Sequence, residues 1–222
     1  MNVVRILAVD DHEMTTTGYK YILEDHNFPN FRVRVETAKN FDLAAKKIKM
    51  SAKGIPYDIV LLDIRLDKDP DEEAKTGMEL GAIVRKETPT SKVVFMSSFS
   101  DNYRINSIFK QVNPDGYMVK SEIDELSLRT MVDTVMNNDP YYTAAALTAM
   151  RRKLGTDITL DAQDEKLLFL LSKGVKTNDI APKISMSHST VEARKRQLKL
   201  LFGVKNGNDL ALIHEAEKRG FL

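Results

Sequence analysis

Residues 5–13 read RILAVDDHE, and their pattern indicates the fold of the first half of the chain. Their apolar run, Ile6 to Val9, has the length expected of a strand that is buried on both faces of a parallel sheet. Asp10 and Asp11 come directly after this run, where a helical pattern begins. Adjacent carboxylates repel each other unless a cation lies between them, so the pair predicts a cation site at the carboxyl end of the strand.

Further apolar strand candidates follow, and an amphipathic helical pattern comes after each of them. The predicted strands are residues 4–9, 31–37, 58–62, 92–96 and 116–119, and the predicted helices are residues 12–26, 40–52, 77–87, 101–112 and 122–137. This alternation predicts an α/β fold, a (βα)5 doubly wound parallel sheet with helices on both faces. In such a sheet the working site lies at the carboxyl ends of the strands.

Composition and charge limit the functional class. The chain has 222 residues, enough for two modest domains, and no cysteine, which excludes disulfides and thiolate zinc sites and predicts a cytoplasmic protein. No stretch is long and apolar enough to span a bilayer, so no membrane partner is expected. Residues 1–150 carry 19 basic and 23 acidic side chains, whereas residues 151–222 carry 14 and 9, so the second part suits a polyanion.

Polar side chains follow the predicted strands at the end where the site is expected. The first strand is followed by Asp10 and Asp11, the third by Asp63, the fourth by Ser97 and Ser98, and the fifth by Lys120. Clustered carboxylates without an imidazole or a thiol favour a hard, oxygen-seeking cation, and Mg²⁺ fits best.

This order of residues resembles the receiver domain of two-component response regulators, a flavodoxin-like domain, over residues 3–137. The resemblance implies that Asp63 accepts a phosphoryl group from a sensor histidine kinase or a small phosphodonor. It also implies that Asp10, Asp11, Asp63 and the backbone carbonyl of Arg65 hold Mg²⁺. A carboxylate is a competent nucleophile for this transfer, because it forms an aspartyl phosphate.

The resemblance further implies a switch in the same pocket. Lys120 would offset charge on the phosphoryl oxygens, and Ser97, with Ser98 beside it, would hydrogen-bond one of them. Tyr117 would then move inward, which turns the chemistry into a conformational change.

The loop after the predicted phosphoacceptor departs from the family pattern. Asp67 stands where a proline is usual, and the acidic insertion 67–76 delays the closing Gly77. The added negative charge is expected either to slow phosphorylation or to serve a partner.

The rest of the chain predicts a linker and a second domain. A turn signal at 138–140 and an alanine-rich centre make residues 138–158 a linker of undefined stiffness. We therefore divide the chain into a receiver domain at 1–137, this linker, and an all-α helix-turn-helix domain at 159–222. The first, second and fourth helices of this domain are predicted at about 161–173, 176–183 and 207–218. The third helix begins after an N-cap, which is either Ser187 or the competing Ser189.

The third of these helices has two predicted sides. The core side carries Val191, Leu198, Leu201 and Phe202, and the opposite arc carries Glu192, Lys195, Arg196 and Lys199. Basic side chains on an exposed helix neutralise phosphates, and Arg196 can pair with guanine in the major groove. The alternative is a solvated, charged face on an ordinary bundle helix.

The spacing of this segment resembles the LuxR-type helix-turn-helix, and together with a receiver domain it gives the NarL/FixJ architecture. The resemblance implies double-stranded DNA as a partner and a homodimer on DNA formed through the fourth helix, although packing within the domain explains that helix equally well. By position, Glu192, Ala193 and Arg196 would read bases, whereas Thr190, Arg194 and Lys199 would lie near the DNA backbone.

The predicted function is a DNA-binding transcriptional response regulator, controlled by Mg²⁺-dependent phosphorylation of Asp63. One alternative is a phosphorylation-independent regulator whose receiver serves as a dimerisation platform. The other is a Mg²⁺-dependent phosphohydrolase, but the predicted site holds no general acid or base beyond the metal ligands, so we do not expect an enzyme.

Overall fold

The computed structural model describes residues 2–66, 76–98, 102–154, 158–204 and 207–222. The acidic residues 67–75 therefore lie outside the described part of the chain. The structure forms two compact units, with the main division between Ala146 and Leu147, and we describe each unit by itself. None of the described helices is long and apolar enough to cross a membrane.

The first unit is built on a parallel sheet of six strands in the order β2-β1-β3-β4-β5-β6. The strands are β1 (Asn2–Val9), β2 (Phe31–Ala38), β3 (Ile59–Leu62), β4 (Lys92–Ser97), β5 (Gly116–Val119) and β6 (Tyr141–Tyr142). The first five are the predicted ones, and the (βα)5 fold is confirmed. The short β6, within the predicted linker, was not anticipated.

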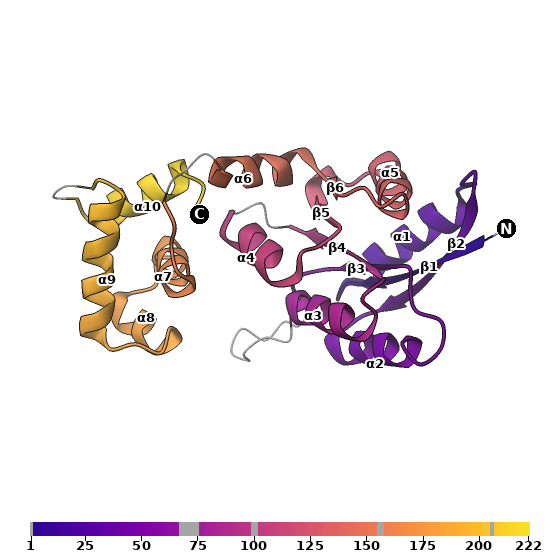
Figure 1. Cartoon of the computed structure of the whole chain (residues 1–222), viewed down its shortest axis with the longest axis horizontal. Coiled ribbons are helices and arrows are strands. Elements are labelled where there is room, and N and C mark those ends of the chain that lie inside the picture. Colours follow the sequence, from indigo (N-terminus) through magenta and orange to yellow (C-terminus); the bar gives the residue numbers. More distant parts are fainter. Residues whose placement is uncertain (1, 67–75, 99–101, 155–157, 205–206) are drawn as a thin grey trace. The chain divides into compact units, whose positions relative to one another are not determined.

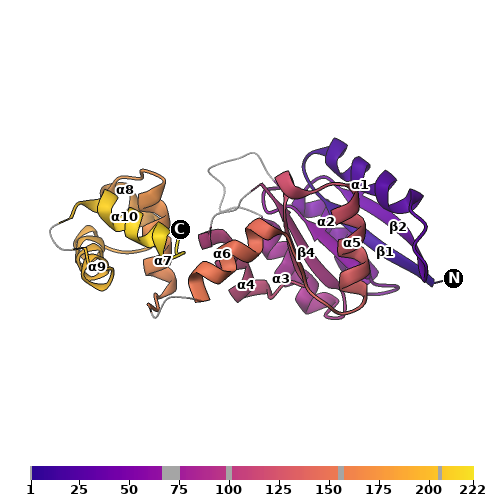
Figure 2. The same cartoon turned by 90° about the horizontal axis from the view of Figure 1, so that it is seen from above.

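Helices cover both faces of this sheet, with α1 and α5 on one side and α2 and α3 on the other (Figures 1 and 2). The helices are α1 (Glu13–Asp25), α2 (Phe41–Ser51), α3 (Gly77–Glu87), α4 (Asn102–Val112) and α5 (Glu125–Met136), and a 3-10 turn, η1 (Lys120–Glu122), follows β5. The central strands β3 and β5 are buried along their whole length, as a parallel sheet covered on both faces requires.

The strand register positions the site. Val9 of β1 lies beside Leu62 of β3, so the residues that follow them, Asp10 and Asp63, leave neighbouring strands at the same level. Farther along the sheet, Ser97 of β4 lies beside Val119 of β5, directly before Lys120. The predicted meeting of these strand ends is therefore a consequence of the register.

The second unit contains the all-α domain. Its helices are α7 (Ala162–Ser172), α8 (Thr177–Lys183), α9 (His188–Leu201) and α10 (Asp209–Lys218), preceded by α6 (Ala144–Leu154), which begins in the first unit. Ser187 caps α9 by accepting a hydrogen bond from Thr190 N–H, as the first of the two predicted caps requires. Gly174 ends α7 at a φ of 74°.

The core side of α9 differs from the prediction at two positions. Lys195 is 6% exposed and lies on the buried stripe with Val191, Leu198 and Phe202, whereas Leu201 is 48% exposed. The expected place of Lys195 on the outer arc is therefore wrong. The physical reason is that the core offers polar partners to its ammonium group, which are described below.

Candidate functional site

The centre of the site is one lysine that joins two buried aspartates. Lys120 Nζ lies 2.6 Å from Asp10 Oδ2 and 2.7 Å from Asp63 Oδ2. Asp10 is 2% exposed and Asp63 is 7% exposed, so both carboxylates have lost most of their hydration. The ammonium group replaces part of it, since charged groups remain buried only when they are paired.

The titration behaviour of the trio follows from this burial. Burial raises the pKa of Asp63 above its usual 3.8, and the charge of Asp10 adds to the effect, although the Lys120 ammonium opposes it. Burial alone would lower the pKa of Lys120, but its hydrogen bonds to Asp10 and Asp63 outweigh burial and raise it. Lys120 therefore stays charged, and burial makes the charged form of Asp63 costly.

Asp11 and His12 complete the acidic corner at the end of β1. The Nδ1 atom of His12 lies 2.7 Å from Asp11 Oδ1 and 3.2 Å from Asp10 Oδ1, and His12 N–H donates to Asp10 Oδ1. Within the described residues, Asp10, Asp11 and His12 form a group whose ligand atoms lie within 4.8 Å of one another. Carboxylate oxygens from Asp10, Asp11 and Asp63 are the donor set that Mg²⁺ prefers, so the residues present fit this ion.

A glycine packs directly against the backbone of Asp63. A Cβ atom added to Gly77 would lie 2.0 Å from the Asp63 carbonyl oxygen, a distance that no side chain allows. Gly77 N–H also donates to Ile64 O, which closes the loop that begins after β3. The residue that the sequence identified as the closing glycine of this loop therefore fixes the position of Asp63.

The other predicted receiver residues lie around the same strand ends. Ser97 ends β4 and is fully buried, whereas Ser98 after it is exposed. Tyr117 in β5 is fully buried, and Arg65 is exposed two residues after Asp63. The register thus places Ser97 and Lys120 at one edge of the sheet, and the Tyr117 ring already lies in the core.

Comparison with known proteins agrees with this geometry. Residues 6–133 match the family model described as "Response regulator receiver domain", which is more than half of the chain. The chain belongs to the response regulator family. With its helix-turn-helix unit, this response regulator has the NarL/FixJ architecture.

Its relatives match over both units. The regulator is 24% identical to the transcriptional regulatory protein MctR of Rhizobium johnstonii over 206 residues, 90% of this chain and 88% of MctR. It is 25% identical to the oxygen regulatory protein NreC of Staphylococcus aureus over 219 residues, 93% and 94% of the two chains. RcsB of Salmonella enterica, solved on a promoter with a phosphomimetic, has a similar fold, with a TM-score of 0.62, 15% identity and coverage of 97% and 98%.

In the second unit of this regulator, α9 carries the predicted DNA contacts, and three of its basic residues have internal partners. Arg194 Nη1 lies 2.7 Å from both Asp161 Oδ2 and Asp164 Oδ1, at the start of α7. Lys199 pairs with Asp209 of α10 at 2.9 Å. These pairs fix α9 against its neighbours.

Lys195 has the most internal position of the three. Its Nζ lies 2.7 Å from Asp209 Oδ2, 3.0 Å from Thr177 Oγ1 and 3.1 Å from Glu192 Oε1. One buried ammonium group thus joins α8, α9 and α10. Its internal partners outweigh the cost of burial and raise its pKa.

The exposed face of α9 differs in composition from the prediction. Arg196 is exposed, and its side chain makes no hydrogen bond or ion pair with the described residues. Thr190 is exposed at the start of the helix and Ala193 is half-buried. Gln197 and Leu200 are also exposed on this face and were not predicted, although a helical wheel centred on the buried stripe would have identified them.

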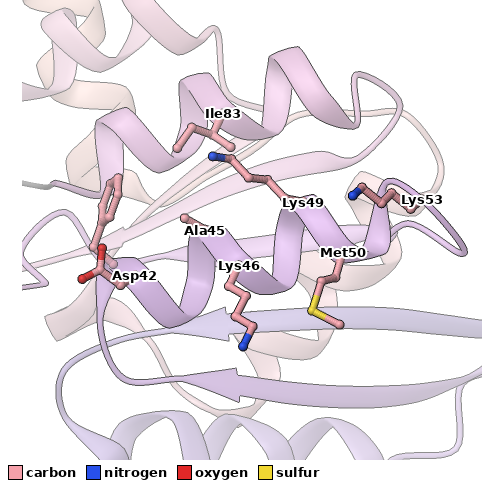
Figure 3. A pocket seen from close by; sticks show the side chains of 8 residues that line it. Asp42, Ala45, Lys46, Lys49, Met50, Lys53 and Ile83 are labelled. Carbon is pink, nitrogen blue, oxygen red and sulfur yellow. The ribbon is translucent and has the colours of Figure 1, made fainter.

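The response regulator also has an open hollow between α2 and α3, with a volume of about 450 Å³ (Figure 3). Lys46 and Lys49 of α2 and Lys53, two residues after that helix, border it, and Ile83 lines it from α3. None of the predicted phosphorylation or DNA-binding residues lines this hollow. It is therefore a separate surface feature and adds no group to the predicted site.

Proposed function

We propose that this chain is a cytoplasmic, DNA-binding transcriptional response regulator, switched by Mg²⁺-dependent phosphorylation of Asp63. The observation that carries the proposal is the Asp10, Asp63 and Lys120 trio at the carboxyl ends of a parallel sheet. The relatives that match both units are named as regulators, and the solved RcsB structure has DNA bound.

In the proposed reaction, an Asp63 carboxylate oxygen attacks the phosphorus of a sensor histidine kinase's phosphohistidine or of a small phosphodonor. A phosphorus–oxygen bond to Asp63 forms and the bond to the donor group breaks. Bound Mg²⁺ would neutralise charge on the phosphoryl oxygens, and Asp10, Asp11, Asp63 and the Arg65 carbonyl are the groups that would hold it.

The protein's own groups then stabilise the product. Lys120 can exchange its hydrogen bond with Asp63 for one with a phosphoryl oxygen while it keeps Asp10, because an ammonium group has three donors. Ser97 supplies a hydroxyl at the end of β4, with Ser98 next to it. Tyr117 already lies inward, so its part in the switch would be to hold the pocket in shape around the new group.

For DNA, we propose that α9 enters the major groove. Arg196 is the strongest candidate for a base contact, because its guanidinium is exposed and has no hydrogen-bond or ion-pair partner in the described part of the chain. Glu192 and Ala193 lie next to it on the same helix, and Thr190 lies at the start, near the DNA backbone. Arg194 and Lys199 would contact phosphate only while they remain paired with Asp161 and Asp209. Lys195 would contribute by fixing α9 against α10.

The proposed assembly is a homodimer on double-stranded DNA, with a receiver domain at 1–137, a linker at 138–158 and the DNA-binding domain at 159–222. Dimeric helix-turn-helix proteins read two half-sites, which raises both affinity and specificity. The half-sites would be about one helical turn apart.

Intact mass tests the phosphorylation step. The full chain would be incubated with acetyl phosphate and Mg²⁺, alongside Asp63→Asn and a sample with EDTA. We expect one phosphoryl adduct on the wild type and none on the variant or without free Mg²⁺. If a folded wild-type protein formed no adduct with acetyl phosphate or with a panel of histidine kinases, the receiver would be a phosphorylation-independent dimerisation platform.

A further inference from the structure

The start of α6 is held by residues on both sides of the site lysine. Lys120 lies between Val119, the last residue of β5, and Glu122, the last residue of the turn η1. Val119 N–H donates to Thr143 Oγ1 at 3.2 Å, and Ala145 N–H lies 3.2 and 3.3 Å from the two carboxylate oxygens of Glu122. The first turn of α6 therefore depends on the same short segment that carries Lys120.

Thr143 connects α6 to β5 in two ways. Its side chain accepts from Val119, and its backbone N–H donates to Tyr117 O at 3.1 Å. Thr143 is only 6% exposed, so loss of its hydroxyl would leave a buried N–H group without a partner. The two tyrosines before it extend this attachment, because β6 pairs with β5 from Gly116 to Tyr117.

Glu122 makes the second attachment through electrostatics. The first N–H groups of a helix have no partner within the helix, and the helix dipole favours a negative charge at this end. A carboxylate that binds Ala145 N–H meets both requirements. Because Glu122 is only two residues from Lys120, movement of the lysine backbone within η1 would displace this carboxylate.

We propose that Thr143 and Glu122 are positioning residues that transmit the state of Lys120 to α6. This inference rests on the proposed function, because phosphorylation of Asp63 supplies the change in the partners of Lys120. In the structure, Lys120 bridges Asp10 and Asp63. When its ammonium group turns to a phosphoryl oxygen, η1 adjusts, the contacts of Val119 and Glu122 change, and the first turn of α6 responds.

Hydrogen–deuterium exchange of the full chain tests this coupling, with intact mass measured on the same samples. In the wild type, we expect exchange of the amides of residues 144–147 to change at least about fivefold between the unmodified and the phosphorylated protein. In Glu122→Ala combined with Thr143→Val, we expect this difference to fall below about twofold, with the adduct yield unchanged. Glu122→Gln keeps an acceptor oxygen and should retain part of the difference.

The matched control is Glu87→Ala, which removes an exposed carboxylate from the end of α3 that has no partner among the described residues. It should behave as the wild type does. If the two residues had a purely structural role, the double variant would exchange faster by the same factor in the unmodified and the phosphorylated protein. The ratio between these two states would then stay as in the wild type, and this result would overturn the proposal. The proposal would also be overturned if the wild type formed the adduct but the exchange of the amides of residues 144–147 did not change. Absence of the adduct would instead overturn the proposed function, and this inference with it.

Discussion

At the scale of single residues, the described part of the site places three carboxylates near the ammonium group of Lys120, which cannot balance them alone. Asp10 and Asp63 are both buried and share Lys120, while Asp11 adds a partly exposed carboxylate next to His12. The sequence predicted these positions, because side chains at consecutive strand ends must converge. It did not predict the contacts of His12, since the spacing of residues along a strand does not determine how a side chain turns.

The excess charge has a consequence for stability. The folded-state pKa of Asp63 lies above its usual 3.8, so between these two values the folded protein binds more protons than the unfolded chain. The free energy of unfolding therefore falls as pH rises through the folded pKa. At neutral pH and without Mg²⁺, we expect Asp63→Asn to be more stable than the wild type, by on the order of 1 kcal/mol.

Urea titrations at several pH values test this expectation. The difference between Asp63→Asn and the wild type should vanish below the unfolded-state pKa, where the carboxyl is protonated in both states. Asp25→Asn, which removes an exposed charge on α1, should show little difference at any pH. If Asp63→Asn were less stable than the wild type at pH 7, the charged Asp63 carboxylate would not destabilise the fold.

Gly77 gives a second prediction at this scale. Because its Cβ would overlap the Asp63 carbonyl, Gly77→Ala should lower the free energy of unfolding by about 3 kcal/mol or displace Asp63. Gly18→Ala is the matched control, since that glycine lies within α1 with open space around it, and it should stabilise the protein by about 0.5–1 kcal/mol. Thermal and urea unfolding would measure both variants, and equal effects would contradict the assigned close contact.

At the scale of elements, helix periodicity predicted α9 well but misplaced two of its residues, the buried Lys195 and the exposed Leu201. A lysine in sequence is assigned to the surface, yet Lys195 lies on the core stripe because Asp209, Thr177 and Glu192 supply acceptors from three helices. No pattern within α9 reveals partners on other elements. The strand β6 was missed for a related reason, since two residues are too few to show alternation.

This assignment predicts opposite phenotypes for adjacent residues. Lys195→Ala should lower the free energy of unfolding by about 2 kcal/mol, because Asp209 loses a nearly buried partner. Arg196→Ala should leave stability unchanged and weaken DNA binding about tenfold. Urea unfolding and fluorescence anisotropy with a duplex selected from a random library would separate the two. If Arg196→Ala lowered the free energy of unfolding, the Arg196 side chain would not be the exposed group that the structure shows.

At the scale of the whole molecule, the uneven charge of the two parts of the sequence agrees with the separate roles proposed for them. The acidic first part holds the carboxylate site, and the basic second part carries α9. Neighbouring acidic side chains pair with three of the α9 cations, so in the proposed DNA complex phosphate attraction would have to come largely from the domain as a whole and from the proposed dimer. The sequence could not show this, because ion pairing depends on tertiary contacts between α7, α9 and α10.

If phosphorylation of Asp63 controls DNA binding, the phosphorylated protein must bind DNA with a different affinity from the unmodified protein. Anisotropy would be measured with a selected duplex, with and without acetyl phosphate and Mg²⁺, for the wild type and Asp63→Asn. We expect binding to be at least about tenfold tighter after phosphorylation of the wild type and unchanged for the variant. Equal affinity of the modified and unmodified wild type, with the adduct verified by mass, would contradict it.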